Sequence, residues 1–136
     1  MKKSKVEILF QKVAVKPGRP TVYGVTEKSC IFGLPGNPVS CFINFELFAK
    51  PLLLKMMGHE LISVEKKHVL AVNFKRKKAD RLEWLPVSIS AEGEVVPASY
   101  HGSAQIHAIS LSQGLMKIPI NTFEILKGEK VYVKHL

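Results

Sequence analysis

The chain has 136 residues, of which 46% are hydrophobic and 23% charged, so it can form one or two packed domains and is not typical of disordered proteins. Twenty lysines and arginines against eleven acidic residues leave a net charge of +9, which favours an anionic partner or serves solubility alone. No apolar run reaches the ~18 residues of a membrane helix, and the basic start leads into no signal-peptide core. We therefore expect a cytoplasmic protein with no membrane partner, whose two cysteines, Cys30 and Cys41, are reduced core residues.

Short apolar runs separated by turn residues predict strands in the first part of the chain. The first covers residues 6–10, and residues 13–15 extend or follow it. Two prolines and a glycine in residues 16–20 predict a turn, and residues 21–25 predict the next strand. Residues 30–34 are apolar on both faces, as in a buried parallel strand. One strand–helix crossover is too little for a complete parallel sheet, so we expect this α/β domain to be partial.

A helix is predicted to follow these strands. Asn37 suits the N-cap because its side chain can accept from a free backbone N–H, and Pro38 suits the first helical position, where no N–H is required. Apolar residues then recur at helical spacing until Gly58, which suits the C-cap. Pro51 lies inside this span, so a kink or a restart is expected near residues 49–50.

The remainder of the chain predicts a β domain. Strand patterns cover residues 64–74, 81–90, 94–98, 114–118 and 130–134. Residues 103–110 fit either a helix or a strand, and the basic run 75–78 predicts a solvated turn. The expected fold class is a partial α/β parallel-sheet domain, residues 1–60, followed by a small all-β, barrel-like domain, residues 61–136.

Two features of the first domain could bind an anion. In residues 34–40 a strand leads into a helix, and free N–H groups at a helix start stabilise phosphate; Gly36 allows close approach and Ser40 adds a hydroxyl. A tight turn before a well-capped helix is the alternative. Lys12 and Lys16 are four residues apart, so both lie on one side of an extended strand and could grip an anion or a metal oxyanion. A solvated strand edge is their alternative.

The order and spacing of these motifs carry a family resemblance. The segment FQKVAVKPGRP at residues 10–20, followed by GLPGNPVS at residues 33–40, resembles the C-terminal part of the MoeA/gephyrin family of molybdopterin molybdotransferases. The β tail, with LKGEKV at residues 126–131, is similar to the C-terminal domain of that family. The resemblance covers nearly the whole chain and implies a first domain of the molybdopterin-binding type.

The resemblance also implies an activity and a set of site residues. Members insert molybdate into adenylylated molybdopterin with release of AMP, in a magnesium-dependent reaction. Lys12 and Lys16 would be catalytic residues that hold molybdate or the substrate phosphates. The implied substrate-binding residues are Pro35, Gly36, Asn37, Pro38, Ser40, Arg81 and Ser103.

Part of the family's machinery is expected to lie outside this chain. The acidic residues that would hold magnesium, and the segment that forms a homodimer, belong upstream in the family, and no acidic residue falls in either motif here. We therefore expect no metal site in this chain, no complete activity from it alone, and a homodimer in the full-length protein. The expected partner is a phosphate-bearing pterin and not nucleic acid.

Two other functions stay open on the sequence. Gephyrin-type proteins use the same architecture to bind a receptor peptide, so a non-catalytic scaffold is the main alternative. A nucleic-acid-binding barrel, with residues 75–78 as its basic contact, is the other. The five histidines show no zinc-ligand spacing, and Trp84 fits a core position better than a binding surface.

Overall fold

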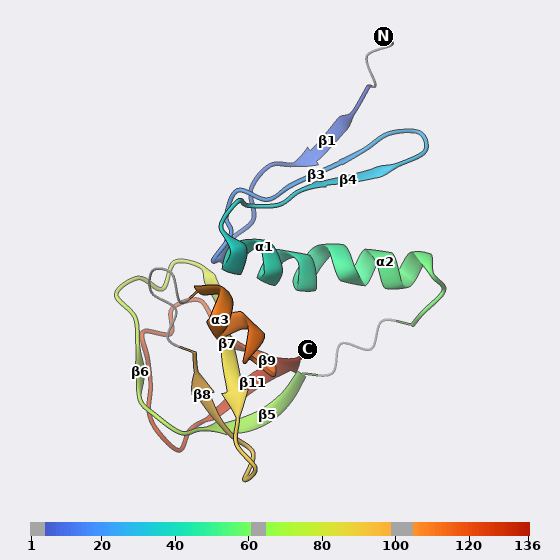
Figure 1. Ribbon diagram of the computed structural model, residues 1–136. Helices are drawn as coiled ribbons and strands as arrows, with labels where there is room; N and C mark the ends of the chain where they lie inside the picture. The colour runs from blue at the N-terminus through green and yellow to red at the C-terminus, as the bar shows by residue number, and fades with distance from the viewer. Residues whose placement is uncertain (1–4, 61–64, 99–104) are drawn as a thin grey trace. The chain divides into compact units, whose positions relative to one another are not determined.

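The computed structural model describes residues 5–60, 65–98 and 105–136. The chain divides into two compact units, Met1–His59 and Glu60–Leu136. Figure 1 shows strands and a long helix in the first unit and mainly strands in the second. Across the described residues, every helix is too short or too polar to pass through a lipid bilayer.

The first unit contains a three-stranded antiparallel sheet. Its strands are β1 (Glu7–Phe10), β3 (Val22–Val25) and β4 (Cys30–Gly33), in the order β1-β3-β4. Tyr23 lies at the centre, where its ring stacks at a tilt on Phe10 and Phe32 of the two outer strands. A further short strand, β2 (Val15–Lys16), lies between β1 and β3 in the sequence.

The prediction of a buried parallel strand at residues 30–34 is wrong. β4 pairs antiparallel with β3, and Cys30, Ile31 and Gly33 are exposed. An apolar run on both faces indicated two covered faces, but β4 is an edge strand among the described residues and has only β3 as its partner. Cys30 is therefore not a core residue, and Cys41 is only half-buried; both are free thiols.

The predicted helix begins and restarts where the sequence indicated. α1 (Pro38–Asn44) continues into a π-helical turn, η1 (Phe45–Ala49), and then into α2 (Lys50–Met56), as one unbroken rod in Figure 1. Pro51 lacks an N–H group, and the turn before it widens so that the Lys50 N–H donates to the Phe45 carbonyl. Gly58 follows the helix with φ +83°, the left-handed conformation typical of a helix end.

The second unit is a small closed β-barrel, as expected. Its five barrel strands are β5 (Glu65–Leu70), β7 (Leu82–Ile89), β8 (Glu94–Pro97), β9 (Gly114–Ile118) and β11 (Lys130–His135). They follow the order β7-β8-β5-β11-β9, and β9 pairs with β7 to close the ring. Within this ring of described strands, the β5–β8 pairing is parallel and the other four are antiparallel. Closure leaves no unpaired edge in the ring.

Two shorter elements complete this unit. β6 (Phe74–Lys75) pairs with β10 (Glu124–Ile125) as a two-stranded ribbon, and α3 (Gln105–Ser110) is a short helix. The single strand predicted for residues 64–74 is therefore wrong, because it is interrupted after Leu70. The ambiguous segment 103–110 is helical over its described part.

Apolar side chains fill the barrel interior. Val87, Val95, Ile118 and Val133 are fully buried in one cluster that draws on all five barrel strands and on β10. Inward and outward residues alternate along β11, as a strand with one solvated face requires. Trp84 is buried, which confirms its predicted place in the core.

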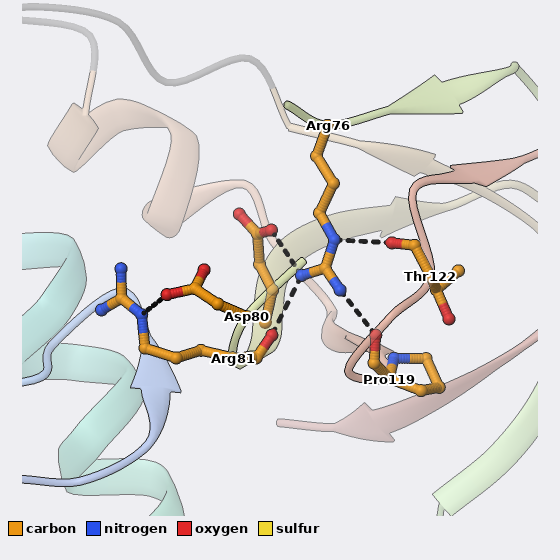
Figure 2. A network of polar contacts seen from close by, with 6 residues as sticks. Arg76, Asp80, Arg81, Pro119 and Thr122 are labelled. Atoms are coloured by element: carbon orange, nitrogen blue, oxygen red, sulfur yellow. Dashed lines mark hydrogen bonds and ion pairs between the residues drawn. The ribbon is translucent and has the colours of Figure 1, made fainter. Parts of the chain in front are cut away.

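Arg76 holds the β6–β7 connection to the rest of the barrel, as Figure 2 shows. Its guanidinium donates to the Thr122 carbonyl at 2.7 Å, the Pro119 carbonyl at 2.5 Å and the Arg81 carbonyl at 3.1 Å. It also pairs with the Glu83 carboxylate at 3.0 Å, and both side chains are only 4% exposed. One planar group thus satisfies three backbone acceptors and one buried charge.

The predicted solvated turn at residues 75–78 is wrong in its second position. The Arg76 side chain points inward, and Lys75 pairs with Glu124 across the β6–β10 ribbon at 2.9 Å. Lys77 and Lys78 are exposed as expected. The basic run in the sequence did not reveal that the Arg76 side chain is buried and donates hydrogen bonds to other parts of the barrel.

Candidate anion-binding site

The connection between β4 and α1 forms the predicted capped helix start. The Asn37 side chain accepts hydrogen bonds from the Ser40 backbone N–H at 3.1 Å and from the Ser40 hydroxyl at 3.3 Å. The Asn37 carbonyl accepts the first helical bond, from Cys41, at 2.8 Å. Asn37 is therefore the N-cap, as predicted, and Pro38 occupies the first helical position. This geometry also matches the alternative interpretation, a tight turn before a well-capped helix. An anion bound here would contact the capped helix start from the solvent side.

Gly36 lies at the exposed tip of this connection. A Cβ atom built on Gly36 would meet no other atom within 4 Å. The position therefore has room for a ligand, and the fold itself does not require a glycine there. Pro35 is half-buried beside it, and Ser40 is buried with its hydroxyl turned to the cap.

The two lysines lie in a looped segment and not on one strand. β1 ends at Phe10 and β2 begins only at Val15, so the premise that one extended strand places Lys12 and Lys16 on the same side is wrong. Lys12 is exposed, and Lys16 is half-buried on β2. The chain leaves the strand at Gln11, ahead of the turn residues 17–20, so the period-two pattern does not hold between the two lysines.

Backbone hydrogen bonds close this segment, which we call the lysine loop (residues 12–19). The Val13 N–H donates to the Arg19 carbonyl at 2.9 Å, and the Thr21 N–H donates to the same carbonyl at 2.9 Å. Gly18 adopts φ +105°, which strongly favours glycine. The lysine loop is thus a defined turn, with its shape fixed at both ends.

One residue that the sequence interpretation missed joins the lysine loop to the helix. Asn44, on α1, is fully buried and donates from Nδ2 to the Ser40 carbonyl at 2.9 Å and to the Gly18 carbonyl at 3.2 Å. Thr21, also fully buried, donates its hydroxyl to the same Gly18 carbonyl at 2.8 Å. Asn44 therefore brings the two predicted motifs together. An asparagine among apolar helix residues was the available indication.

The described residues do not fit the implied magnesium ion. They contain no cluster of three histidine, cysteine or acidic side chains suited to a metal. In the first unit, the buried Glu46 carboxylate is already neutralised by Lys50, with both oxygens 2.9 Å from the ammonium. Magnesium needs carboxylate oxygens that are free to coordinate it, and both oxygens of Glu46 are taken by Lys50.

Arg81 and Ser103 are the two site residues predicted in the second unit, and Arg81 is the one that the structure describes. Arg81 directs its guanidinium toward Asp80 and away from Arg76, as Figure 2 shows. Its Nε lies 3.4 Å from the Asp80 carboxylate, an ion pair without hydrogen-bond geometry, and the side chain is 28% exposed. Ser103 lies outside the described residues.

Comparison with known proteins follows this division into two units. Residues 2–55 match the family model described as "Probable molybdopterin binding domain". Residues 67–136 match the model described as "MoeA C-terminal region (domain IV)". The chain belongs to the MoeA family. The resemblance that the two sequence motifs carried is thereby confirmed.

Individual members of the MoeA family resemble the chain over most of its length. A molybdopterin molybdenumtransferase of Staphylococcus aureus is 34% identical over 118 residues, 85% of this chain, and one of Staphylococcus epidermidis is 32% identical over 97% of it. The solved molybdopterin biosynthesis MoeA protein of Pyrococcus horikosii is 32% identical over 94% of the chain, with a TM-score of 0.82. A molybdenum cofactor biosynthesis protein of Pyrococcus furiosus is 26% identical over 96%, with a TM-score of 0.77.

The chain spans only part of each relative. It covers 28% of the length of the S. aureus protein, 32% of the S. epidermidis protein, and 32% and 45% of the two solved chains. The activities of those whole proteins therefore belong to chains about two to four times longer than the segment that this chain matches.

Proposed function

We propose that this chain is the substrate-anion-binding part of a molybdopterin molybdotransferase, which inserts molybdate into adenylylated molybdopterin. Residues 1–60 would form the C-terminal part of its molybdopterin-binding domain, and residues 61–136 its C-terminal β domain. Family membership and the names of the relatives support this assignment.

One observation carries the proposal beyond family membership. The lysine loop and the capped start of α1, two segments rich in features that favour anions, are joined through Asn44. Lysine ammonium groups and backbone dipoles placed around one position stabilise charge without reorganising when the ligand arrives.

The site residues keep the roles that the resemblance implied. Lys12 and Lys16 would hold molybdate or the adjacent substrate phosphates and offset the charge as AMP departs. The phosphate pocket would be shaped by Pro35, Gly36, Asn37, Pro38 and Ser40. Arg81 and Ser103 stay predicted substrate-binding residues of the second unit.

The complete reaction would need more than these residues. Because the described residues offer no carboxylate set for magnesium, we expect the 136-residue chain alone to bind anions without completing the transfer. Cytoplasmic location, a homodimer in the full-length protein and a mixed sheet, in which further strands pair parallel with an edge of the antiparallel β1-β3-β4 sheet, are parts of the same proposal. Exposed apolar residues on the two edge strands, Ile8 and Leu9 on β1 and Ile31 on β4, support the last of these.

Calorimetric titration of adenylylated molybdopterin, with molybdate and AMP as simpler probes, tests the proposal. We expect saturable binding that weakens at least roughly tenfold in Lys12→Ala/Lys16→Ala, because charged hydrogen bonds to the ligand are lost. Lys28→Ala, at the exposed β3–β4 turn, is the matched control and should bind as the wild type does. Equal binding by all three proteins would contradict the assigned lysines.

Gly36→Ala sharpens the same test. The added methyl group meets no atom of the protein, so the free energy of unfolding should stay within about 0.5 kcal/mol of the wild-type value. A ligand that approaches the backbone there would clash with that methyl, and its affinity should fall. Unchanged affinity would place the bound anion elsewhere.

A non-catalytic scaffold is the second candidate, and the apolar residues on β1 favour it. A folded chain that binds none of the three anions, yet binds apolar peptides independently of Lys12 and Lys16, would support it over the transferase assignment. A nucleic-acid-binding role has no comparable observation, because Arg76 in the basic run is buried.

A further inference from the structure

Asn44 connects the lysine loop and the first turn of α1 through one amide group. Its Nδ2 donates to the Ser40 carbonyl, in the first turn of α1, and to the Gly18 carbonyl, two residues after Lys16. Ser40 in turn donates to the N-cap residue Asn37. A continuous series of hydrogen bonds therefore runs from the helix cap to the lysine loop.

The contact between Asn44 and Gly18 is closely fitted. A Cβ atom at Gly18 would lie only 1.7 Å from Nδ2 of Asn44 and 3.3 Å from its Oδ1. The amide thus lies against the face of Gly18 that a side chain would occupy. Any displacement of the lysine loop toward the helix is blocked by the amide, and any displacement away from it breaks the hydrogen bond to Gly18.

Asn44 is not the residue that stability alone would place there. It is fully buried, and its Oδ1 has no hydrogen-bond partner among the described residues. A buried acceptor without a partner is unfavourable, and an apolar side chain of similar volume would avoid that cost. What the amide supplies, and an apolar residue would not, is a directional bond that fixes the loop relative to the helix.

We propose that Asn44 is a positioning residue, which holds the Lys16-bearing loop against the start of α1 so that both act on one anion. This inference rests on the proposed function for the identity of the anion. Asn44 itself does not touch the ligand; it acts through Gly18 and the lysine loop. Removing the amide should therefore make Lys16 less effective without removing Lys16.

A double-mutant cycle in anion affinity tests the coupling. AMP and molybdate are titrated into the 136-residue chain as wild type, Asn44→Ala, Lys16→Ala and the double variant. We expect Asn44→Ala to weaken binding roughly tenfold, and Lys16→Ala to cost much less in that background than in the wild type. Additive effects of the two substitutions would overturn the positioning role.

Two further variants separate positioning from general loosening of the fold. Ile43→Val, at the fully buried neighbour of Asn44, removes a methylene from the same helix but leaves both hydrogen bonds, so its affinity should match that of the wild type. Asn44→Leu keeps the branching of the side chain and removes the bonds, and it should repeat the loss seen with Asn44→Ala. Equal weakening by Ile43→Val would mean that stability, not position, sets the affinity.

Amide hydrogen exchange decides the matter if the wild-type chain binds no anion, a result that would defeat the proposed function alone. In Asn44→Ala the Val13 and Thr21 amides, which close the lysine loop on Arg19, should exchange at least roughly tenfold faster. The same amides should keep wild-type rates in Ile43→Val. Unchanged exchange in Asn44→Ala would show that the loop holds its position without the amide, and the inference would fail.

Discussion

The interiors of the two units differ: one is mainly an apolar core, and the other contains several buried polar side chains. The barrel has one apolar cluster of nine buried residues drawn from its strands and the β6–β10 ribbon. Among the residues that the structure describes, the first unit buries fewer apolar side chains, yet it contains four of the five buried polar or charged residues, namely Thr21, Ser40, Asn44 and Glu46. The barrel ring is closed, whereas the sheet of the first unit ends in exposed apolar edge strands.

This difference separates stability from geometry. Apolar burial is strong but non-directional, so the barrel can tolerate repacking as long as its volume is conserved. Buried hydrogen bonds add little net stability, but they fix particular atoms relative to one another. The unit that is proposed to bind the substrate anions thus relies on directional contacts, and the unit beside it in the sequence relies on its core.

Arg76→Ala tests the one place where the barrel departs from this pattern, and it should have the largest effect. The change breaks the buried ion pair with Glu83 and removes the donor to three carbonyls, so the barrel should lose about 3–5 kcal/mol of unfolding free energy. Urea unfolding followed by the fluorescence of Trp84, the single tryptophan, reports on this unit. Lys75→Ala, which breaks an exposed ion pair, should cost under about 1 kcal/mol. Similar losses in the two variants would contradict the structural role of Arg76.

Leu70→Ala tests the apolar core directly. Leu70 is fully buried in the barrel cluster, and its truncation should lower the unfolding free energy by about 2–5 kcal/mol through lost burial and the cavity left behind. Leu126, which is 51% exposed, provides the control, since Leu126→Ala should change it by no more than about 0.5 kcal/mol. Leu70→Ala should leave the anion affinity unchanged under conditions where the variant is folded. A loss of affinity together with the loss of stability would show that the barrel core also supports anion binding.

Asn37→Ala should have a smaller effect, and one confined to the first unit. The side chain caps α1 through the Ser40 N–H, and losing such a cap costs about 1 kcal/mol. Circular dichroism at increasing urea should show earlier loss of helix, while Trp84 fluorescence keeps its wild-type midpoint. Glu27→Ala, in the exposed β3–β4 turn, should leave both transitions unchanged. A shift of the tryptophan transition would mean that the helix cap also stabilises the barrel.

The features that the sequence predicted well depend on local chemistry. Asn37 and Pro38 at the helix start, the restart before Pro51 and the left-handed Gly58 each follow from the backbone requirements of one residue type. The barrel strands followed from short strand-forming runs bounded by turn residues, although β7 and β9 are buried on both faces and only β11 alternates clearly. Family motifs then supplied the site residues, whose roles stay predictions.

The features that the sequence did not predict depend on contacts distant along the chain. Arg76 is buried because Pro119 and Thr122 present carbonyl groups to it, and nothing near Arg76 in the sequence reveals that. The Asn44–Gly18 contact joins residues 26 positions apart. Exposure of β4 depends on which strands are available to pair with it, so an apolar run alone could not decide its burial.

The His68–His135 pair gives the smallest predicted effect and extends the comparison to pH. Their Nε2 atoms lie 2.9 Å apart, and Nδ1 of His68 lies 2.9 Å from the Gly93 carbonyl. That carbonyl can only accept, so His68 carries a proton on Nδ1 and the Nε2 proton shared by the pair belongs to His135. Protonating both rings would break this contact between the end of β11 and β5.

Acidification should therefore weaken the barrel slightly. Slight desolvation of its ring against the barrel, with smaller contributions from His68 and Lys66, lowers the pKa of His135 below its usual value of 6.5. The unfolded chain then binds more protons than the folded chain below pH 6.5, so the stability present above that pH is lost as pH falls toward the lowered pKa. Because His135 is exposed to solvent, the loss should be no more than about 0.5 kcal/mol. His135→Gln should flatten the pH dependence of the Trp84 unfolding transition, whereas His59→Gln, at an exposed position of the first unit, should not. An equal pH dependence in the wild type and both variants would exclude the histidine pair as the source of the effect.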